Sequence, residues 1–174
     1  MTEIKPRLIS AIFAKFDRLS DPVLAIYSQM VLVLTAATLF YVAYTDFHQF
    51  IIRNELVLVL AGLFLLYAVL SGEWTQLHWH IGFAALMSAI MVYYYSQKLM
   101  AGGDVKLLAV AFLWTGPLYA LPFAVVLTIF MCAYIVLVKF GWANAQRVQG
   151  SARIPLAPSI AGALIVLFAA KLAA

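Results

Sequence analysis

The chain has 174 residues, of which 66% are hydrophobic and only 10% are charged. Its mean hydropathy is +1.01. A water-soluble domain carries about 25% charged residues, so the composition excludes a soluble globular fold and makes lipid the solvent for most of the surface. The net charge of +4 does not indicate a nucleic-acid partner, because basic residues in membrane proteins commonly mark cytoplasmic loops. The single cysteine, Cys132, excludes an internal disulfide and a zinc-type cysteine spacing.

Residues 1–22 form the first segment, in which basic and acidic residues alternate with apolar ones. Between residues 4 and 19 the apolar positions recur at helical spacing, which favours an amphipathic helix lying on the membrane surface. A polar tail without regular structure is the alternative. We expect this segment to precede one membrane domain over residues 23–174.

Several apolar runs reach the roughly 20 residues that a helix needs to cross a bilayer. They do not alternate as the strands of a membrane barrel would. The sequence therefore predicts an all-α polytopic integral membrane protein with about six transmembrane helices. A break at residues 115–117 divides the long run after residue 105, because proline lacks a backbone donor and disfavours helix before it. The expected helices cover about 23–45, 56–70, 79–95, 105–115, 118–140 and 155–172.

Six crossings place three polar loops, 46–55, 96–106 and 139–154, on one side of the membrane. These loops carry six basic residues that the two opposite loops lack: Arg53, Lys98, Lys106, Lys139, Arg147 and Arg153. The bias of Lys and Arg toward the inside makes this side cytoplasmic. The N-terminal segment also carries basic residues but falls on the other side. We keep the cytoplasmic assignment because three basic loops outweigh this one segment.

Two aspartates are the strongest candidates for chemistry, because ionisable groups at membrane depth are costly. Asp46 ends the first expected span and Asp104 opens the fourth, so both lie near the same face. Two close carboxylates share one proton and can activate a water between them, which is aspartyl-protease chemistry without a metal or cofactor. Alternatively, Asp104 caps a helix and Asp46 pairs with Arg53.

Gly102 and Gly103 precede Asp104 and permit backbone torsions or close approaches that side chains forbid. They would let an extended substrate lie beside the carboxylate. The histidines are weaker candidates: His48 lies near Asp46 at the interface, and two histidines alone, His78 and His80, make a poor metal site.

Three segments resemble bacterial type 4 prepilin peptidases, most closely the short tight-adherence pilus branch. MAGGDVKLLAVAFLWTGP, residues 100–117, resembles the family's Gly-x-Gly-Asp segment. Asp46 with the downstream Ile52-Arg53-Asn54 resembles the first catalytic aspartate and its Ile-Pro-Asn. ARIPLAPSIAGALI, residues 152–165, is similar to the segment that begins the family's last helix.

The resemblance implies that Asp46 and Asp104 are the catalytic pair of a multi-pass protease in the bacterial inner membrane, with its active site facing the cytoplasm. The implied substrate is the leader of a prepilin or pseudopilin, cut after a glycine. Nothing matches the cysteine-containing domain of larger members, so N-methylation is not expected. The residues expected to bind substrate or support the pair are Gly102, Gly103, Lys106, Arg53 and Asn54.

The sequence departs from the family pattern at three places. Ala101 replaces the first glycine of Gly-x-Gly-Asp, Arg53 replaces a proline, and Leu156-Ala157 replaces Tyr-Gly. A positive φ at Ala101 would be strained. A non-catalytic membrane subunit or a small transporter with an intramembrane carboxylate pair is the alternative function.

Overall fold

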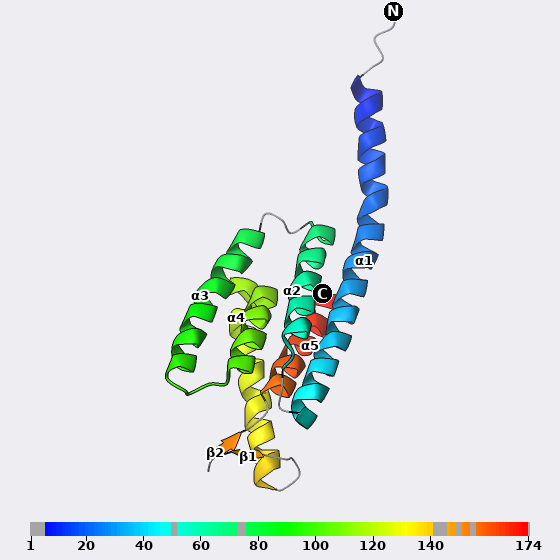
Figure 1. Ribbon diagram of the computed structural model, residues 1–174. Coiled ribbons are helices and arrows are strands. Elements are labelled where there is room, and N and C mark those ends of the chain that lie inside the picture. Colours follow the sequence, from blue (N-terminus) through cyan, green and yellow to red (C-terminus); the bar gives the residue numbers. More distant parts are fainter. Residues whose placement is uncertain are drawn as a thin grey trace, which may run out of the picture.

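The computed structural model describes residues 6–49, 52–72, 76–140, 146–148, 151–153 and 156–173, with side chains described for residues 23–49, 52–72, 76–140 and 156–172. Five helices and one short hairpin make up these residues (Figure 1). In chain order they are α1 Pro6–Gln49, α2 Asn54–Leu70, α3 Leu77–Ser96, α4 Gly102–Lys139, β1 Gln146–Val148, β2 Ser151–Arg153 and α5 Ala157–Ala173.

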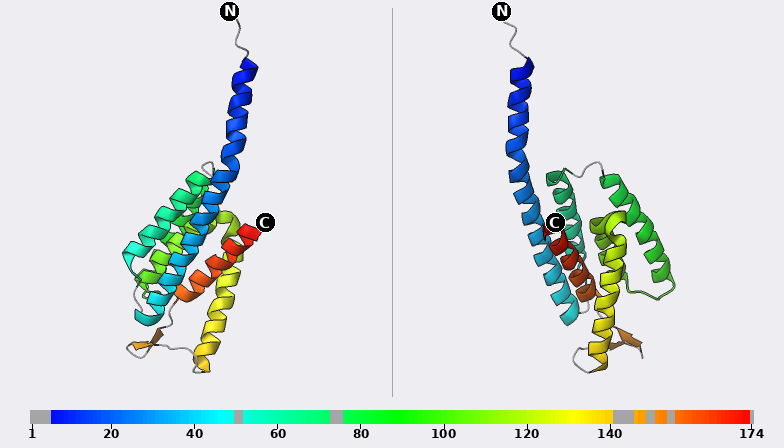
Figure 2. Two further views of the ribbon diagram at one scale, coloured as in Figure 1. Left: turned by 90° about the vertical axis from the view of Figure 1, so that its right-hand side faces the viewer. Right: turned by 180° about the vertical axis from the view of Figure 1, so that it is seen from behind.

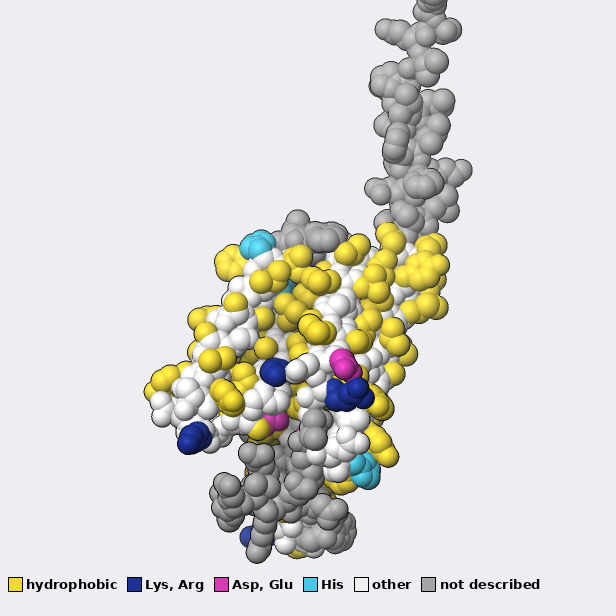
Figure 3. Space-filling view, in the orientation of Figure 1, with side chains coloured by type: hydrophobic (Ala, Val, Ile, Leu, Met, Phe, Trp, Pro, Cys, Tyr) yellow, Lys and Arg dark blue, Asp and Glu magenta, His cyan; other side chains and the backbone are white. Residues whose placement is uncertain are grey.

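The membrane character of the chain is visible on its surface. Hydrophobic side chains cover most of the face in Figure 3, and the charged side chains visible there lie in its lower half. Leu58, Leu118 and Leu121 are each more than 70% exposed, which fits contact with lipid. Three stretches are long and apolar enough to cross a membrane: Val23–Gln49, Leu77–Ser96 and Gly102–Lys139. The helices Asn54–Leu70 and Ala157–Leu172 are apolar but shorter.

α1 is a single helix of 44 residues that continues through residue 22, where the sequence suggested a boundary. The backbone of residues 6–22 is therefore helical, and their side chains lie outside the described part of the chain. The amphipathic character of the N-terminal segment stays a prediction. Residue 22 does not mark a helix end.

α4 contains the break that Pro117 predicts. Gly116 adopts φ 56° and ψ −171°, outside the helical region, and it separates two helical arms. Pro117 has no N–H to donate to the carbonyl of Leu113, four residues earlier. His80 satisfies that carbonyl instead, with its Nδ1 2.9 Å from the oxygen. Since a carbonyl only accepts, His80 Nδ1 carries the hydrogen.

The second arm of α4 runs back toward the end of the bundle where α4 begins (Figures 1 and 2). The second arm packs closely against α5. A side chain at Gly162 would meet the ring of Phe130 at 3.2 Å, so the glycine lets the two helices approach.

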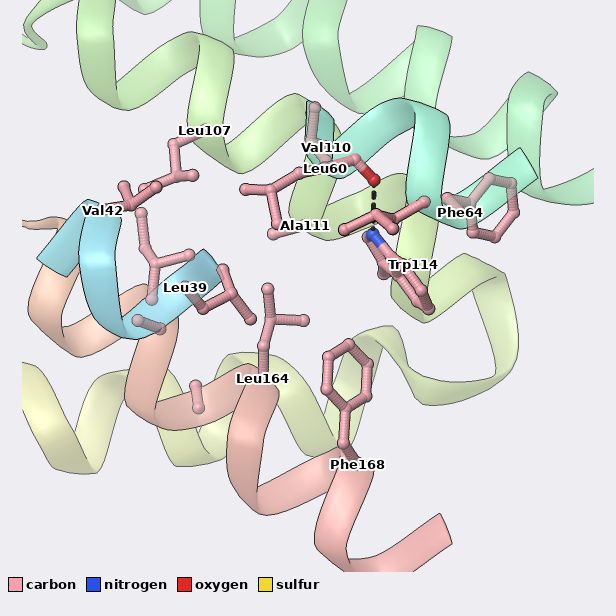
Figure 4. Close-up of a cluster of buried hydrophobic side chains, with 14 of the residues drawn as sticks. Leu39, Val42, Leu60, Phe64, Leu107, Val110, Ala111, Trp114, Leu164 and Phe168 are labelled. Atoms are coloured by element: carbon pink, nitrogen blue, oxygen red, sulfur yellow. Dashed lines mark hydrogen bonds between the residues drawn. The ribbon is translucent and has the colours of Figure 1, made fainter. Parts of the chain in front are cut away.

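The core lies between α1, α2, α5 and the first arm of α4 (Figure 4). Trp114 is central to it: its indole N–H donates to the backbone carbonyl of Leu60 over 3.1 Å. Its ring meets Phe64 and Phe168 edge-on, with centroids 5.4 and 5.0 Å apart. This hydrogen bond and these ring contacts fix α2 and α5 against α4.

β1 and β2 form an antiparallel hairpin between α4 and α5, with Gln146 opposite Arg153. The sequence suggested only a polar loop over residues 139–154. Six residues in two three-residue strands carry too little apolar alternation to be recognised from sequence.

Candidate active site

Asp46 lies one turn from the end of α1 and is 5% exposed. Its Oδ2 accepts a hydrogen bond from the backbone N–H of Ala157, 3.2 Å away. Ala157 is the first residue of α5, so this N–H has no acceptor within its own helix. A carboxylate at a helix N-terminus is also favoured by the helix dipole. The start of α5 therefore holds Asp46 in place.

Asp104 lies in the first turn of α4, as its third residue, and is partly buried. The sequence suggested Asp104 as the residue that caps this helix. That prediction is wrong, because the helix begins two residues earlier and Ala101 occupies the capping position without a side-chain hydrogen bond. The N-terminal end of α4 still favours a negative charge at Asp104.

The start of α4 packs against the connection between α1 and α2. A side chain on Gly103 would touch Ile52 at 3.4 Å. Val42, one turn before Asp46, and Leu107, one turn after Asp104, are both fully buried and lie side by side in Figure 4. Asp46 near the end of α1 and Asp104 near the start of α4 therefore lie at the same end of the bundle (Figure 1).

Lys106 and Asn54 form a second link at this end. The Lys106 ammonium donates to Asn54 Oδ1 over 2.9 Å, which joins the start of α2 to the first turn of α4. Both residues were expected to support the aspartates, and the structure brings them together. Both are exposed, so this hydrogen bond orients the two helix ends more than it stabilises the fold.

Arg53 does not pair with Asp46. Its guanidinium lies 2.8 Å from the carboxylate of Glu55, and both side chains are more than half exposed. The reading of Asp46 as a simple partner of Arg53 is therefore wrong. Arg53 also precedes α2 with φ −72° and ψ 131°, values that proline adopts readily. The backbone here thus has the shape that the family's usual proline would give.

The two glycines before Asp104 serve close packing. Neither has a positive φ, and both lie inside α4. A side chain on Gly102 would meet the ring of Tyr95 at 3.2 Å. Ala101 has φ −79° and ψ 145°, which any residue adopts. Alanine is therefore unstrained at the position where the family usually has glycine.

Two groups near Asp46 could not be found from sequence. One is the Ala157 N–H, which lies 111 positions along the chain from Asp46. The other is Tyr134, on the second arm of α4, which interacts electrostatically with Asp46. No motif marks Tyr134, since it lies in a continuous apolar run.

The histidines lie at both ends of the bundle. His48 is exposed, and its ring packs against Tyr44 and Phe47. His80 and its neighbour His78 belong to the start of α3, at the other end of the bundle. Within the described residues no cluster of three or more His, Cys, Asp or Glu side chains could hold a metal ion.

Comparison with known proteins covers both aspartates. The model of the type IV leader peptidase family matches residues 33–137, well over half of the 174 residues. The match ends before the segment 152–165 that we compared with the family's last helix. No curated protein and no solved structure matches the chain. Because the family model covers most of the chain, including both aspartates, the chain belongs to the type IV leader peptidase family and is a membrane peptidase.

Proposed function

We propose that the chain is an aspartyl endopeptidase that removes the leader of a prepilin or pseudopilin by cutting after a glycine. One observation carries the proposal. In a chain of the leader peptidase family, Asp46 is held by the first N–H of α5, at the end of the bundle where Asp104 opens α4. This arrangement supplies two acids on separate helices and requires no cofactor for hydrolysis.

In the proposed reaction the two carboxyl groups share one proton, since two adjacent negative charges repel each other. The ionised carboxylate takes a proton from a bound water, whose oxygen attacks the scissile carbonyl carbon. The protonated carboxyl group gives its proton to the carbonyl oxygen. In the second step the carboxyl group that now carries the proton gives it to the amine nitrogen as the C–N bond breaks. A hydroxyl of the tetrahedral intermediate gives its proton to the other carboxylate as the new carbonyl forms, so that the pair again holds a single proton. The rigid hydrogen bond to Asp46 keeps one carboxylate oriented through both steps.

The location of the reaction follows from the charge pattern. The exposed basic residues Arg53, Lys98, Lys106 and Lys139 lie in or beside the connections at the end that carries the aspartates. With the two arms of α4 counted separately, six crossings of a bacterial inner membrane put this end in the cytoplasm. A leader on the cytoplasmic side could then reach the pair while the apolar segment after it stays in lipid.

A peptide panel tests the substrate. Each peptide carries a basic leader, a glycine and an apolar segment, and its control replaces the glycine with valine. The purified protein in detergent is expected to cut the first peptide after the glycine and to leave the control intact, as read by mass spectrometry. Cleavage elsewhere in the peptides would contradict the leader assignment. Uptake of a solute into liposomes, with no peptide cut, would favour the transporter alternative.

A further inference from the structure

The second arm of α4, after the break at Gly116, turns one stripe of side chains toward the rest of the bundle. Its buried or partly buried members recur every three or four residues: Phe123, Leu127, Met131, Tyr134 and Val138. Side chains with this spacing share one face of a helix. The neighbouring Ala133 and Ile135 are exposed, which confirms that Tyr134 is turned inward. Tyr134 is therefore the polar member of an otherwise apolar inward stripe.

The packing of this arm against α5 gives the level at which Tyr134 lies. A side chain on Gly162 would meet the ring of Phe130, so these two positions face each other. Tyr134 lies one turn beyond Phe130, about 6 Å nearer the end of the bundle that carries the aspartates. α5 begins at that end and runs the opposite way, so Pro158 lies about 6 Å from Gly162 in the same direction. Tyr134 is therefore level with the first turn of α5.

Asp46 lies at the same level, because the first N–H of α5, that of Ala157, donates to its Oδ2. In Figures 1 and 2 the start of α5 lies between the end of α1 and the second arm of α4. α5 packs against both helices. Tyr134 interacts electrostatically with Asp46 across this junction. The level of Tyr134, its inward direction and this interaction together place its phenol beside the Asp46 carboxylate.

We propose that Tyr134 is a positioning residue of the peptidase site, which orients the Asp46 carboxylate together with the Ala157 N–H. The inference rests on the proposed function and adds to it a residue from the second arm of α4. A phenol O–H is a hydrogen-bond donor, and it can donate to a carboxylate oxygen directly or through one bound water. The Ala157 N–H holds one oxygen of Asp46 and leaves the carboxylate free to rotate about that bond. A second group from another helix limits this rotation and keeps the carboxylate aimed at the attacking water.

Tyr134→Phe tests the role, because it removes the hydroxyl group and keeps the ring that packs. The kcat for leader cleavage is expected to fall about tenfold, the effect of losing one hydrogen bond to a charged group. KM should stay near the wild-type value, because Tyr134 acts on Asp46 and not on the substrate. Tyr119→Phe is the matched control: Tyr119 is an exposed tyrosine at the other end of the same arm, and its loss should leave kcat unchanged. Thermal unfolding in detergent checks that both variants fold.

Fluorine NMR tests the contact without any cleavage. 3-Fluorotyrosine placed at position 134 reports the charge near its ring, so its resonance should shift when Asp46→Asn removes the carboxylate. Glu55→Gln neutralises an exposed carboxylate and should leave this resonance in place. 3-Fluorotyrosine at position 119, at the other end of the arm, should respond to neither substitution.

The outcomes separate this inference from the proposed function. Wild-type cleavage with an unchanged kcat in a folded Tyr134→Phe protein would overturn the inference and leave the function standing. A raised KM with unchanged kcat would also overturn it, because Tyr134 would then bind substrate instead of orienting Asp46. So would a fluorine resonance at position 134 that does not respond to Asp46→Asn. If the wild type cut no leader, the proposed function would fail, and the fluorine shift would still decide whether Tyr134 faces Asp46.

Discussion

Replacement of Ala157 by proline isolates the hydrogen bond that holds Asp46. Proline has no N–H, and its ring carbon would stand where the hydrogen now points toward Asp46 Oδ2, 3.2 Å from the nitrogen. Proline is well tolerated at the first position of a helix, so α5 should still form. The substitution therefore removes the contact to the carboxylate while keeping the helix.

The expected loss follows from the geometry. A hydrogen bond to a charged group contributes about 1.5–3 kcal/mol, and 3.2 Å is long for such a bond, which favours the lower figure. About 1.5 kcal/mol corresponds to roughly a tenfold effect. We expect the kcat of Ala157→Pro for leader cleavage to fall at least about tenfold, with further loss from displacement of the carboxylate.

Ala157→Gly is the matched control, because glycine keeps the N–H. Loss of a fully buried methyl group and the lower helix propensity of glycine should cost about 1–2 kcal/mol of stability. Its kcat should stay near the wild-type value. Thermal unfolding in detergent checks that both variants fold. A folded Ala157→Pro protein with unchanged kcat would refute the role assigned to the start of α5.

Two further predictions concern the backbone. Gly116→Ala should destabilise the protein by about 2 kcal/mol or more, because φ is +56° and the new Cβ would lie 2.6 Å from His80 Cε1. Gly62 in α2 has open space around it, so Gly62→Ala should instead stabilise the protein by up to about 1 kcal/mol. Thermal unfolding in detergent measures the stability of both variants. Equal changes in stability would contradict the strain expected at Gly116. Arg53→Pro should keep both fold and activity, since φ is already −72° and the exposed pair with Glu55 contributes at most about 1 kcal/mol. A misfolded Arg53→Pro protein, seen by thermal unfolding and a cleavage assay, would show that the backbone there does not suit proline.

Much of the architecture could be predicted because its signals are local. Apolar runs of sufficient length gave α2 and α3 to within about two residues of their ends, the usual uncertainty in helix boundaries. The break at Gly116 was predicted because Pro117 disrupts a helix by its covalent structure alone. Asp46 and Asp104 stood out because so few acids occur in so apolar a chain.

The parts that could not be predicted depend on contacts between distant segments. The start of α4 at Gly102 rather than near Asp104 depends on the packing of two glycines against Tyr95 and Ile52. The hydrogen bond between Ala157 and Asp46 joins two helix ends through backbone geometry, which no side-chain pattern reports. The role of His80 likewise follows from a carbonyl that Pro117 leaves without a donor in α4.

The most direct test of the two-aspartate mechanism is leader cleavage by purified Asp46→Asn and Asp104→Asn proteins reconstituted in lipid. Asparagine is nearly the same size as aspartate but cannot exchange the proton that the reaction needs. Glu55→Gln is the matched control, because it neutralises an exposed carboxylate at the same end of the bundle. Mass spectrometry should find no cut leader with either aspartate variant and normal cleavage with Glu55→Gln. Retained cleavage by a folded Asp46→Asn or Asp104→Asn protein would contradict the mechanism.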